Sequence, residues 1–452
     1  MDKENANKQF HKMTNESVGK LLLTLSIPTI LSMMVTNIYN LVDTAFIGKL
    51  GTSQSAATGI VFSFMAILQA CAFMCGQGAG SIMSRRLGAK NINEATKYTS
   101  TGFFMSFSLG LIIAIVTFIF MTPILKIMGS TETIAPYART YITYILISAP
   151  FFTSSFTMNN FLRYEGKAKL GTVGMLTGSI LNILGDALFI FVFKLGIAGA
   201  GLSTALSQFI SFSILISMFL FNRTQTKISI KYVAKDLATY WEIAATGFPS
   251  LLRQGLNSVA TMILNNQAAI YGDAAVSAMS NVSRISFFPM SIAIGIGQGF
   301  QPICAYNYGA NKKDRVKKAF FWAFVASEIV LTLISIPIAI CPGPLIKILR
   351  DDIEVIKIGS RALSLLCLGQ LFLPLTMMVE MGFQSTGAKL LATISSSLRS
   401  GLLFIPLLII LSKIRGLSGI QEAQPLSFVL TFLICIYLCT KFLQRLSDDN
   451  SN

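Results

Sequence analysis

The sequence predicts an all-α membrane protein with 12 transmembrane helices in two pseudo-symmetric six-helix bundles. Three observations predict this fold class: the composition, a series of long apolar stretches and an internal repeat. Of the 452 residues, 53% are hydrophobic and only 12% are charged, whereas an average soluble domain is about 25% charged. A net charge of +16 often indicates nucleic-acid binding, but on so apolar a chain it is more typical of loops beside an anionic lipid leaflet. We therefore expect the lipid bilayer as a partner and no nucleic acid.

Twelve apolar stretches are long enough to cross a bilayer, which takes about 20 residues in a helix. Polar or glycine-containing breaks separate them, such as those at Gly51, Gly129 and Asn311. Several stretches contain proline, which membrane helices tolerate where neighbouring groups satisfy the freed backbone. In chain order, the predicted spans cover residues 21–47, 55–84, 98–126, 135–161, 168–193, 197–221, 240–270, 275–306, 318–346, 355–384, 390–412 and 417–440.

The lysines and arginines predict the orientation of these spans. If the N-terminus is cytoplasmic, 23 of the 36 basic residues fall in inner segments, 10 in outer segments and 3 within spans. Basic residues are enriched in the cytoplasmic loops of membrane proteins. Both termini are therefore predicted to lie in the cytoplasm, as an even number of spans also requires.

The two halves of the chain resemble each other at an offset of 221 residues. Pro28 and Pro249 differ by this number, and the tripeptide Gly76–Gly78 recurs as Gly297–Gly299. Six spans are an even number, so the halves have the same orientation, as in transporters built from parallel repeats. The predicted parts are a cytoplasmic N-terminal segment, an N-lobe, a cytoplasmic linker, a C-lobe and a cytoplasmic tail. They cover residues 1–20, 21–221, 222–239, 240–440 and 441–452.

The sequence offers little catalytic chemistry. Its single histidine, His11, lies in the polar N-terminal segment, which argues against a His-based metal site or triad. The seven cysteines lie in or beside apolar stretches, where small core residues are expected. No Gly-x-x-x-x-Gly-Lys-Ser/Thr phosphate loop occurs, so an ion gradient is the expected energy source. We expect a transporter rather than an enzyme, with Na⁺ or H⁺ as coupling ion and no cofactor.

Acidic residues within spans are costly and mark functional sites. Asp43 lies near the outer end of the first predicted span, and Asp186 lies in the outer half of the fifth. Asn182 precedes Asp186 by four residues, so their side chains share one helix face, and Thr204 falls at similar depth in the sixth span. These oxygens suit Na⁺, whereas two close carboxylates also suit proton exchange. Alternatively, each acid extends to the interface or pairs with a basic neighbour.

Three groups of motifs resemble the multidrug and toxic compound extrusion (MATE) family. Val42–Gly48 resembles the family's first helix. Leu181–Asp186 and Gly196–Ala200, followed by Thr204, resemble its fifth and sixth helices, and Gly297–Ala310 resembles the end of its eighth. The resemblance extends over about residues 15–445, which is nearly the whole chain.

The resemblance implies a cation-coupled exporter with N-lobe and C-lobe bundles of six helices. In family members of this type, the first-helix Asp, the fifth-helix Asn and Asp and the sixth-helix Thr form a cation site. These roles would fall on Asp43, Asn182, Asp186 and Thr204. Other branches of the family have a further acidic site in the C-lobe. The counterpart of Asp43 at the 221-residue offset is Leu264, so the C-lobe has no equivalent acid at that position.

Further ionisable residues lie in the predicted C-lobe spans. Glu380 and Glu328, together with Arg284, form a candidate polar site there, and Glu380 is the candidate for a C-lobe acid. Arg253, Arg284 and Arg399 are candidate ion-pair partners of the two glutamates.

Candidate substrate-contacting residues precede Asp43 on the first predicted span. They are Asn37, Tyr39 and Met33. Methionine adapts its shape to different ligands and aromatic rings attract organic cations, so such residues could line a permissive drug cavity.

These residues and this resemblance predict a monomeric plasma-membrane antiporter that exports cationic or amphipathic drugs in exchange for Na⁺ or H⁺. The alternative is a flippase for a lipid-linked oligosaccharide, which needs a basic cavity for a pyrophosphate group. The in-span arginines keep that alternative open, whereas twelve spans and an acid-bearing N-lobe argue against it. A passive channel is a third alternative, which gradient-driven accumulation would exclude.

Overall fold

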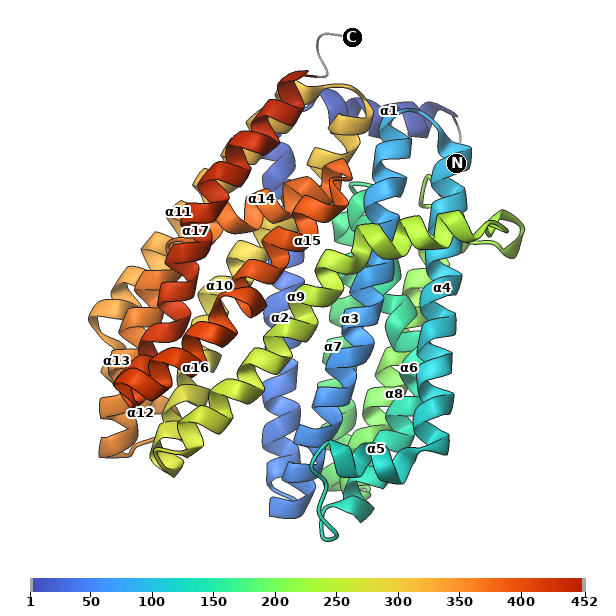
Figure 1. Ribbon diagram of the computed structural model, residues 1–452. Coiled ribbons are helices and arrows are strands. Elements are labelled where there is room, and N and C mark those ends of the chain that lie inside the picture. Colours follow the sequence, from blue (N-terminus) through green and yellow to red (C-terminus); the bar gives the residue numbers. More distant parts are fainter. Residues whose placement is uncertain (1–2, 449–452) are drawn as a thin grey trace. The chain divides into compact units, whose positions relative to one another are not determined.

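The computed structural model describes residues 3–448, which form seventeen α-helices and contain no strand (Figure 1). The helices are α1 (Lys3–Asn15), α2 (Val18–Gly48), α3 (Thr52–Gly88), α4 (Ile92–Ile119), α5 (Met121–Ile127), α6 (Ala135–Tyr164), α7 (Ala168–Asp186), α8 (Gly196–Leu220), α9 (Leu237–Ala269), α10 (Asp273–Gly309), α11 (Lys313–Ile340), α12 (Pro342–Leu349), α13 (Ile353–Gln370), α14 (Leu373–Thr386), α15 (Lys389–Ser397), α16 (Phe404–Arg415) and α17 (Leu417–Asp448). Two π-helical segments, η1 (Ala187–Val192) and η3 (Leu398–Leu402), and one 3₁₀ turn, η2 (Ile230–Tyr232), complete the secondary structure of the described residues.

Every predicted apolar stretch coincides with a helix or with a bent succession of helices. By length and composition, seven described helices could each cross a membrane, counting α7 with η1 as one. The pair α13 and α14 could do so together across a bend of 50°. The helices α6, α9 and α10, with 30, 33 and 37 residues, are also long enough and carry many Ser, Thr, Asn and Gln side chains. The predicted all-helical architecture is confirmed.

The internal repeat is visible in the backbone. Positive φ angles, which mark left-handed turns between helices, recur in pairs at the predicted offset. The offset is 221 residues for the first three pairs and 220 for the fourth. The pairs are Gly51 and Gly272, Lys90 and Asn311, Gly166 and Gly387, and Gly196 and Gly416.

The chain forms two compact units, which we describe separately. Unit 1 consists mainly of Leu31–Leu251 and also contains α1, and unit 2 consists mainly of residues 252–308 and 312–448 together with Glu16–Ile30. The helices α2 and α9 therefore each contribute to both units. Along each of them, the chain passes from one unit to the other two residues after a proline, Pro28 in α2 and Pro249 in α9.

In unit 1, α6 packs against α3, α4, α7 and α8. An apolar core that includes Tyr141, Ile145 and Phe152 lies along it. Small residues bring α7 and α8 together: a Cβ added to Gly178 would lie 2.9 Å from Cβ of Ser211. Membrane helices approach closely at such small residues, and this approach places the polar side chains of α7 beside those of α8.

In unit 2, α17 packs against α11, α13, α14 and α16. A Cβ added to Gly382 on α14 would lie 2.8 Å from the ring of Phe442 on α17. The absence of a side chain at Gly382 therefore lets α14 lie directly on α17. Two residues earlier, Glu380 is only 2% exposed, so this packing encloses an acidic side chain within the unit.

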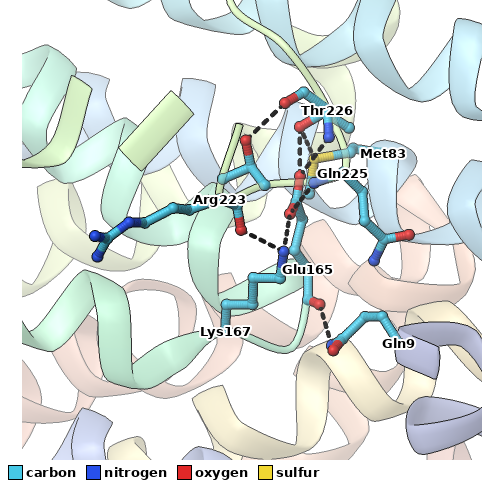
Figure 2. Close-up of polar contacts among 8 residues, drawn as sticks. Gln9, Met83, Glu165, Lys167, Arg223, Gln225 and Thr226 are labelled. Atoms are coloured by element: carbon cyan, nitrogen blue, oxygen red, sulfur yellow. Dashed lines mark hydrogen bonds and ion pairs between the residues drawn. The ribbon is translucent and has the colours of Figure 1, made fainter. Parts of the chain in front are cut away.

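The buried carboxylate of Glu165, between α6 and α7, holds the start of the predicted linker (Figure 2). It accepts hydrogen bonds from the backbone N–H groups of Gln225 and Thr226, both at 2.9 Å, and one from the Thr226 hydroxyl. Nζ of Lys167 lies 3.8 Å from the same carboxylate, and burial lowers the pKa of Lys167. The backbone oxygen of Glu165 accepts a hydrogen bond from the Gln9 side chain of α1 at 2.8 Å.

The helix α4 holds the next part of the linker. The Ser100 hydroxyl donates to the backbone oxygen of Lys227 at 2.9 Å and accepts from the N–H of Ser229 at 3.2 Å. The Thr101 hydroxyl accepts from the N–H of Ala234 at 2.9 Å. The segment 225–234 is therefore fastened to unit 1 at both of its ends.

Candidate functional site

The four residues predicted to bind a cation lie in the interior of unit 1. Asp43 comes from α2, Asn182 and Asp186 from α7, and Thr204 from α8, and none is more than 3% exposed. Nδ2 of Asn182 donates a hydrogen bond to the Thr204 hydroxyl at 3.2 Å. The carboxyl groups of Asp43 and Asp186 are close enough to interact electrostatically. The structure thus brings together residues that are up to 161 positions apart in the sequence.

Three further side chains surround this group. The hydroxyl of Tyr141 on α6 lies near Asp43 and Thr204, and that of Tyr39 on α2 lies near both carboxylates. The Ser203 hydroxyl accepts from Nδ2 of Asn182 at 3.4 Å and donates to its backbone oxygen at 2.9 Å. Neither Tyr141 nor Ser203 was predicted from the sequence to belong to the site. The adjacency of Ser203 to Thr204 was a usable signal, whereas nothing in the sequence sets Tyr141 apart from the other tyrosines.

The backbone beside the site departs from the α-helix. The helix α7 ends at Asp186 and the π-helical segment η1 begins at the next residue. On α8, a Cβ added to Gly199 would lie 2.9 Å from the backbone oxygen of Phe189 in η1. Only glycine permits this approach, which explains why a glycine-rich segment opens α8. Wider π-helical turns are frequent at functional sites, and this one directly follows a buried acid.

Four buried oxygen atoms of the site have no hydrogen-bond partner among the described residues. They are Oδ1 of Asp43, Oδ1 of Asn182 and both carboxylate oxygens of Asp186. Buried polar atoms are nearly always paired, because an unpaired one costs about 1–3 kcal/mol and more when it is charged. A bound cation, or protons on the carboxylates, would remove this cost. Two acids with a neutral amide and a hydroxyl form an oxygen ligand set suited to a small monovalent cation.

A narrow cavity adjoins the site within unit 1. It holds about 10 Å³, enough for a single water molecule. Asn182 belongs to both the cavity wall and the cation-site group, and Tyr39 is the one predicted substrate residue on that wall. Met33 and Asn37 are half-buried and do not line it. The lining residues are Thr36, Tyr39, Phe156, Met175, Gly178, Ser179, Asn182, Gln208 and Ser211.

The candidate polar residues of the second half are distributed differently from the prediction. Nη1 of Arg253 lies 2.6 Å from Oε1 of Glu380 in an ion pair inside unit 2, and the buried Arg399 interacts electrostatically with both. Arg284 is exposed and Glu328 is half-buried, and neither forms a hydrogen bond or ion pair with any described residue. The buried polar group of unit 2 therefore contains Glu380 with Arg253 and Arg399, and it does not contain Arg284 or Glu328.

Comparison with known proteins adds a family match. The profile of the MatE family matches residues 28–188 and 249–410, so its two copies begin 221 residues apart, at Pro28 and Pro249. The chain is 26% identical over 454 residues to the multidrug export protein MepA of Staphylococcus haemolyticus, covering 99% of this chain and 98% of that protein. It is 27% identical over 446 residues to the MepA protein of Staphylococcus aureus strain MSSA476, with 98% of each chain covered.

Solved structures show the same fold. The chain matches the outward-facing conformation of a multidrug resistance MATE family transporter of the MOP superfamily with a TM-score of 0.91 and 22% identity, over 97% of this chain and 98% of that one. It matches a MOP superfamily transporter from Pyrococcus furiosus with a TM-score of 0.90 and 22% identity, over 96% and 98%. A mutant of the Vibrio cholerae MATE transporter VcmN matches with a TM-score of 0.89 and 22% identity, over 95% of this chain and 98% of that one.

Proposed function

The chain belongs to the MATE family of multi-pass membrane transporters, and we propose that it is a secondary active exporter of cationic or amphipathic organic compounds, driven by Na⁺ or H⁺. The exchanged cation binds at Asp43, Asn182, Asp186 and Thr204. One observation supports this proposal above the others: Asp43, Asn182 and Asp186 carry four buried oxygens without hydrogen-bond partners.

The charge of the site couples the binding of the cation to the binding of the drug. With both carboxylates ionised, the interior of unit 1 carries two negative charges that attract an organic cation. Binding of Na⁺ or H⁺ neutralises part of this charge and weakens the attraction. Because linkage is reciprocal, bound drug weakens cation binding by the same factor. A cation that enters from outside therefore favours release of drug, which is the requirement for antiport.

The substrate class rests on the relatives, because both relatives described above are named multidrug export proteins. In the proposed orientation both termini are cytoplasmic in the plasma membrane of a monomeric protein, since 23 of 36 basic residues then face the cytoplasm.

Reconstitution into proteoliposomes tests the function and identifies the coupling ion. Na⁺ and pH gradients are imposed separately, and uptake of a fluorescent organic cation is recorded for the wild type, Asp43→Asn and Asp186→Asn. Both variants are expected to lose gradient-driven transport while they are still inserted and monodisperse. Asp351→Asn is the matched control, because its carboxylate is 74% exposed and far from any site residue in the sequence. Export at the wild-type rate by both site variants would overturn the cation-site assignment.

A further inference from the structure

Two arginines and one glutamate form a buried charged group in unit 2. Arg253 comes from α9, Glu380 from α14 and Arg399 from η3, and they are 8%, 2% and 5% exposed. Arg253 pairs with Glu380 at 2.6 Å, whereas Arg399 forms no ion pair with any described residue. The thiol of Cys435 on α17 also interacts electrostatically with Arg399. Two positive charges thus share one negative charge.

This imbalance cannot be removed by loss of a proton, because a guanidinium stays protonated in proteins. An uncompensated charge inside a membrane protein is costly and marks a functional position. In addition, Nη1 of the buried Arg399 has no hydrogen-bond partner among the described residues. A charged hydrogen-bond donor that is buried and unpaired in this way points to a bound ligand that supplies the acceptor.

The internal repeat gives this position a counterpart. At the 221-residue offset that Gly166 and Gly387 keep, Arg399 corresponds to Gly178, which lines the cavity beside the cation site of unit 1. At the same offset, Arg253 corresponds to Ser32. Among the described residues, the two polar groups therefore differ in charge: the group in unit 1 has two buried aspartates without a basic partner, and the group in unit 2 has one arginine more than its single glutamate.

We propose that Arg253 and Arg399 form a binding position for a monovalent anion, with Glu380 as the intramolecular competitor for Arg253. The ligand is either the carboxylate of a zwitterionic or acidic organic substrate or a chloride ion. Arginine forks match a carboxylate in shape and charge, and Arg399 offers its Nη1 donor. This inference rests on the proposed export function and assigns a place in unit 2 for the carboxylate of those substrates that carry one.

Equilibrium binding to the purified full-length protein in nanodiscs tests this position without any gradient, so its outcome is independent of the coupling cation. The first arm compares norfloxacin with its methyl ester, which lacks the carboxylate, in a chloride-free HEPES buffer that contains no carboxylate. The wild type is expected to bind the acid about tenfold more tightly than the ester, and Arg399→Gln should reduce the ratio to about one. The second arm measures the thermal unfolding midpoint in the same HEPES buffer with and without chloride, and without drug. A midpoint raised by chloride in the wild type but not in Arg399→Gln identifies chloride as a ligand.

Three further variants keep the test decisive. Arg361→Gln breaks an Arg–Glu pair at the surface of unit 2, where Arg361 is 51% exposed, and it should leave both arms unchanged. Arg399→Lys retains the charge and should retain part of the effect, which matters if the glutamine variant does not fold. Glu380→Gln removes the competitor and should raise the affinity for the acid several-fold. If neither arm depends on Arg399, or if Glu380→Gln leaves anion affinity unchanged or weaker, the proposal is overturned.

Discussion

The side-chain amide of Asn182 donates to the Thr204 hydroxyl across 3.2 Å, and this bond fixes which end of the amide faces the site. Since the nitrogen is engaged by α8, the amide oxygen is left without a hydrogen-bond partner, as are both oxygens of Asp186 one turn later. Thr204 thus contributes to the site in two ways: as an oxygen of its own and as the group that orients Asn182.

Replacing Thr204 by valine tests this orientation. Thr204→Val keeps the volume but removes the nearer acceptor of the Asn182 amide and leaves only the Ser203 hydroxyl at 3.4 Å, so the amide is held less firmly. We expect the concentration of coupling cation that gives half-maximal export to rise about tenfold, which corresponds to about 1.4 kcal/mol. Thr204→Ser retains the hydroxyl and should stay close to the wild type. Equal cation dependence in the valine variant and the wild type would contradict this role.

Packing at Gly199 gives a second prediction. An alanine Cβ there would lie 2.9 Å from the backbone oxygen of Phe189, and a backbone atom cannot turn aside as a side chain can. Gly199→Ala should therefore destabilise the protein by about 1–3 kcal/mol and weaken the protection by Na⁺ or low pH against thermal unfolding. At Gly59 the added Cβ would meet no atom within 4 Å, so Gly59→Ala should be neutral or slightly stabilising. A stable Gly199→Ala variant with intact cation protection would refute the prediction.

The start of α9 gives a prediction about pH. Asp236 accepts a hydrogen bond from the N–H of Thr239 at 2.9 Å, and Nζ of Lys97 lies 3.2 Å from its carboxylate. Hydrogen bonds from Thr239 and Lys97 lower the pKa of Asp236 from 3.8 to about 2. Because the pKa is lower in the folded state, the contact is fully present above about pH 4 and is lost as the pH falls through 2.

Hydrogen exchange at the Thr239 amide measures this contact. In the wild type, protection should persist at pH 5 and decrease toward pH 2. In Asp236→Ala, protection should be low at both values, so that the difference between wild type and variant disappears at the acidic end. A constant difference over this range would show that another group caps α9.

The Glu165 carboxylate gives a fourth prediction. Glu165→Ala leaves the backbone N–H groups of Gln225 and Thr226 without their acceptor. We expect faster cleavage by trypsin at Lys227 and Lys231 in the purified protein. Glu16→Ala is the matched control, because Glu16 belongs to unit 2 and its carboxylate pairs with the exposed Lys20 at 2.8 Å. Unchanged cleavage in Glu165→Ala would mean that the α4 contacts alone hold the segment.

Much of the fold followed from the sequence because apolar length and repeated glycines are local signals. The four proposed cation ligands could also be picked out, since a carboxylate inside an apolar stretch is conspicuous and a spacing of four residues fixes a helix face. Pairings between side chains on distant spans were harder to predict. From the sequence, three arginines were possible partners of two glutamates, and only the helix packing shows that Arg253 pairs with Glu380 while Arg284 is exposed. The position of Tyr141 beside Asp43 likewise depends on tertiary contacts.

The π-helical segments have a consequence for how the duplicated chain has diverged. Between Gly166 and Gly196 the first half has one residue more than the second half has between Gly387 and Gly416, and η1 is one residue longer than η3. A wider turn can absorb an inserted residue without rotating the helix that follows. The stretch next to Asp186 is therefore where the chain tolerates a change in length, so that an insertion there can alter the surroundings of the acid and leave the register of α8 intact.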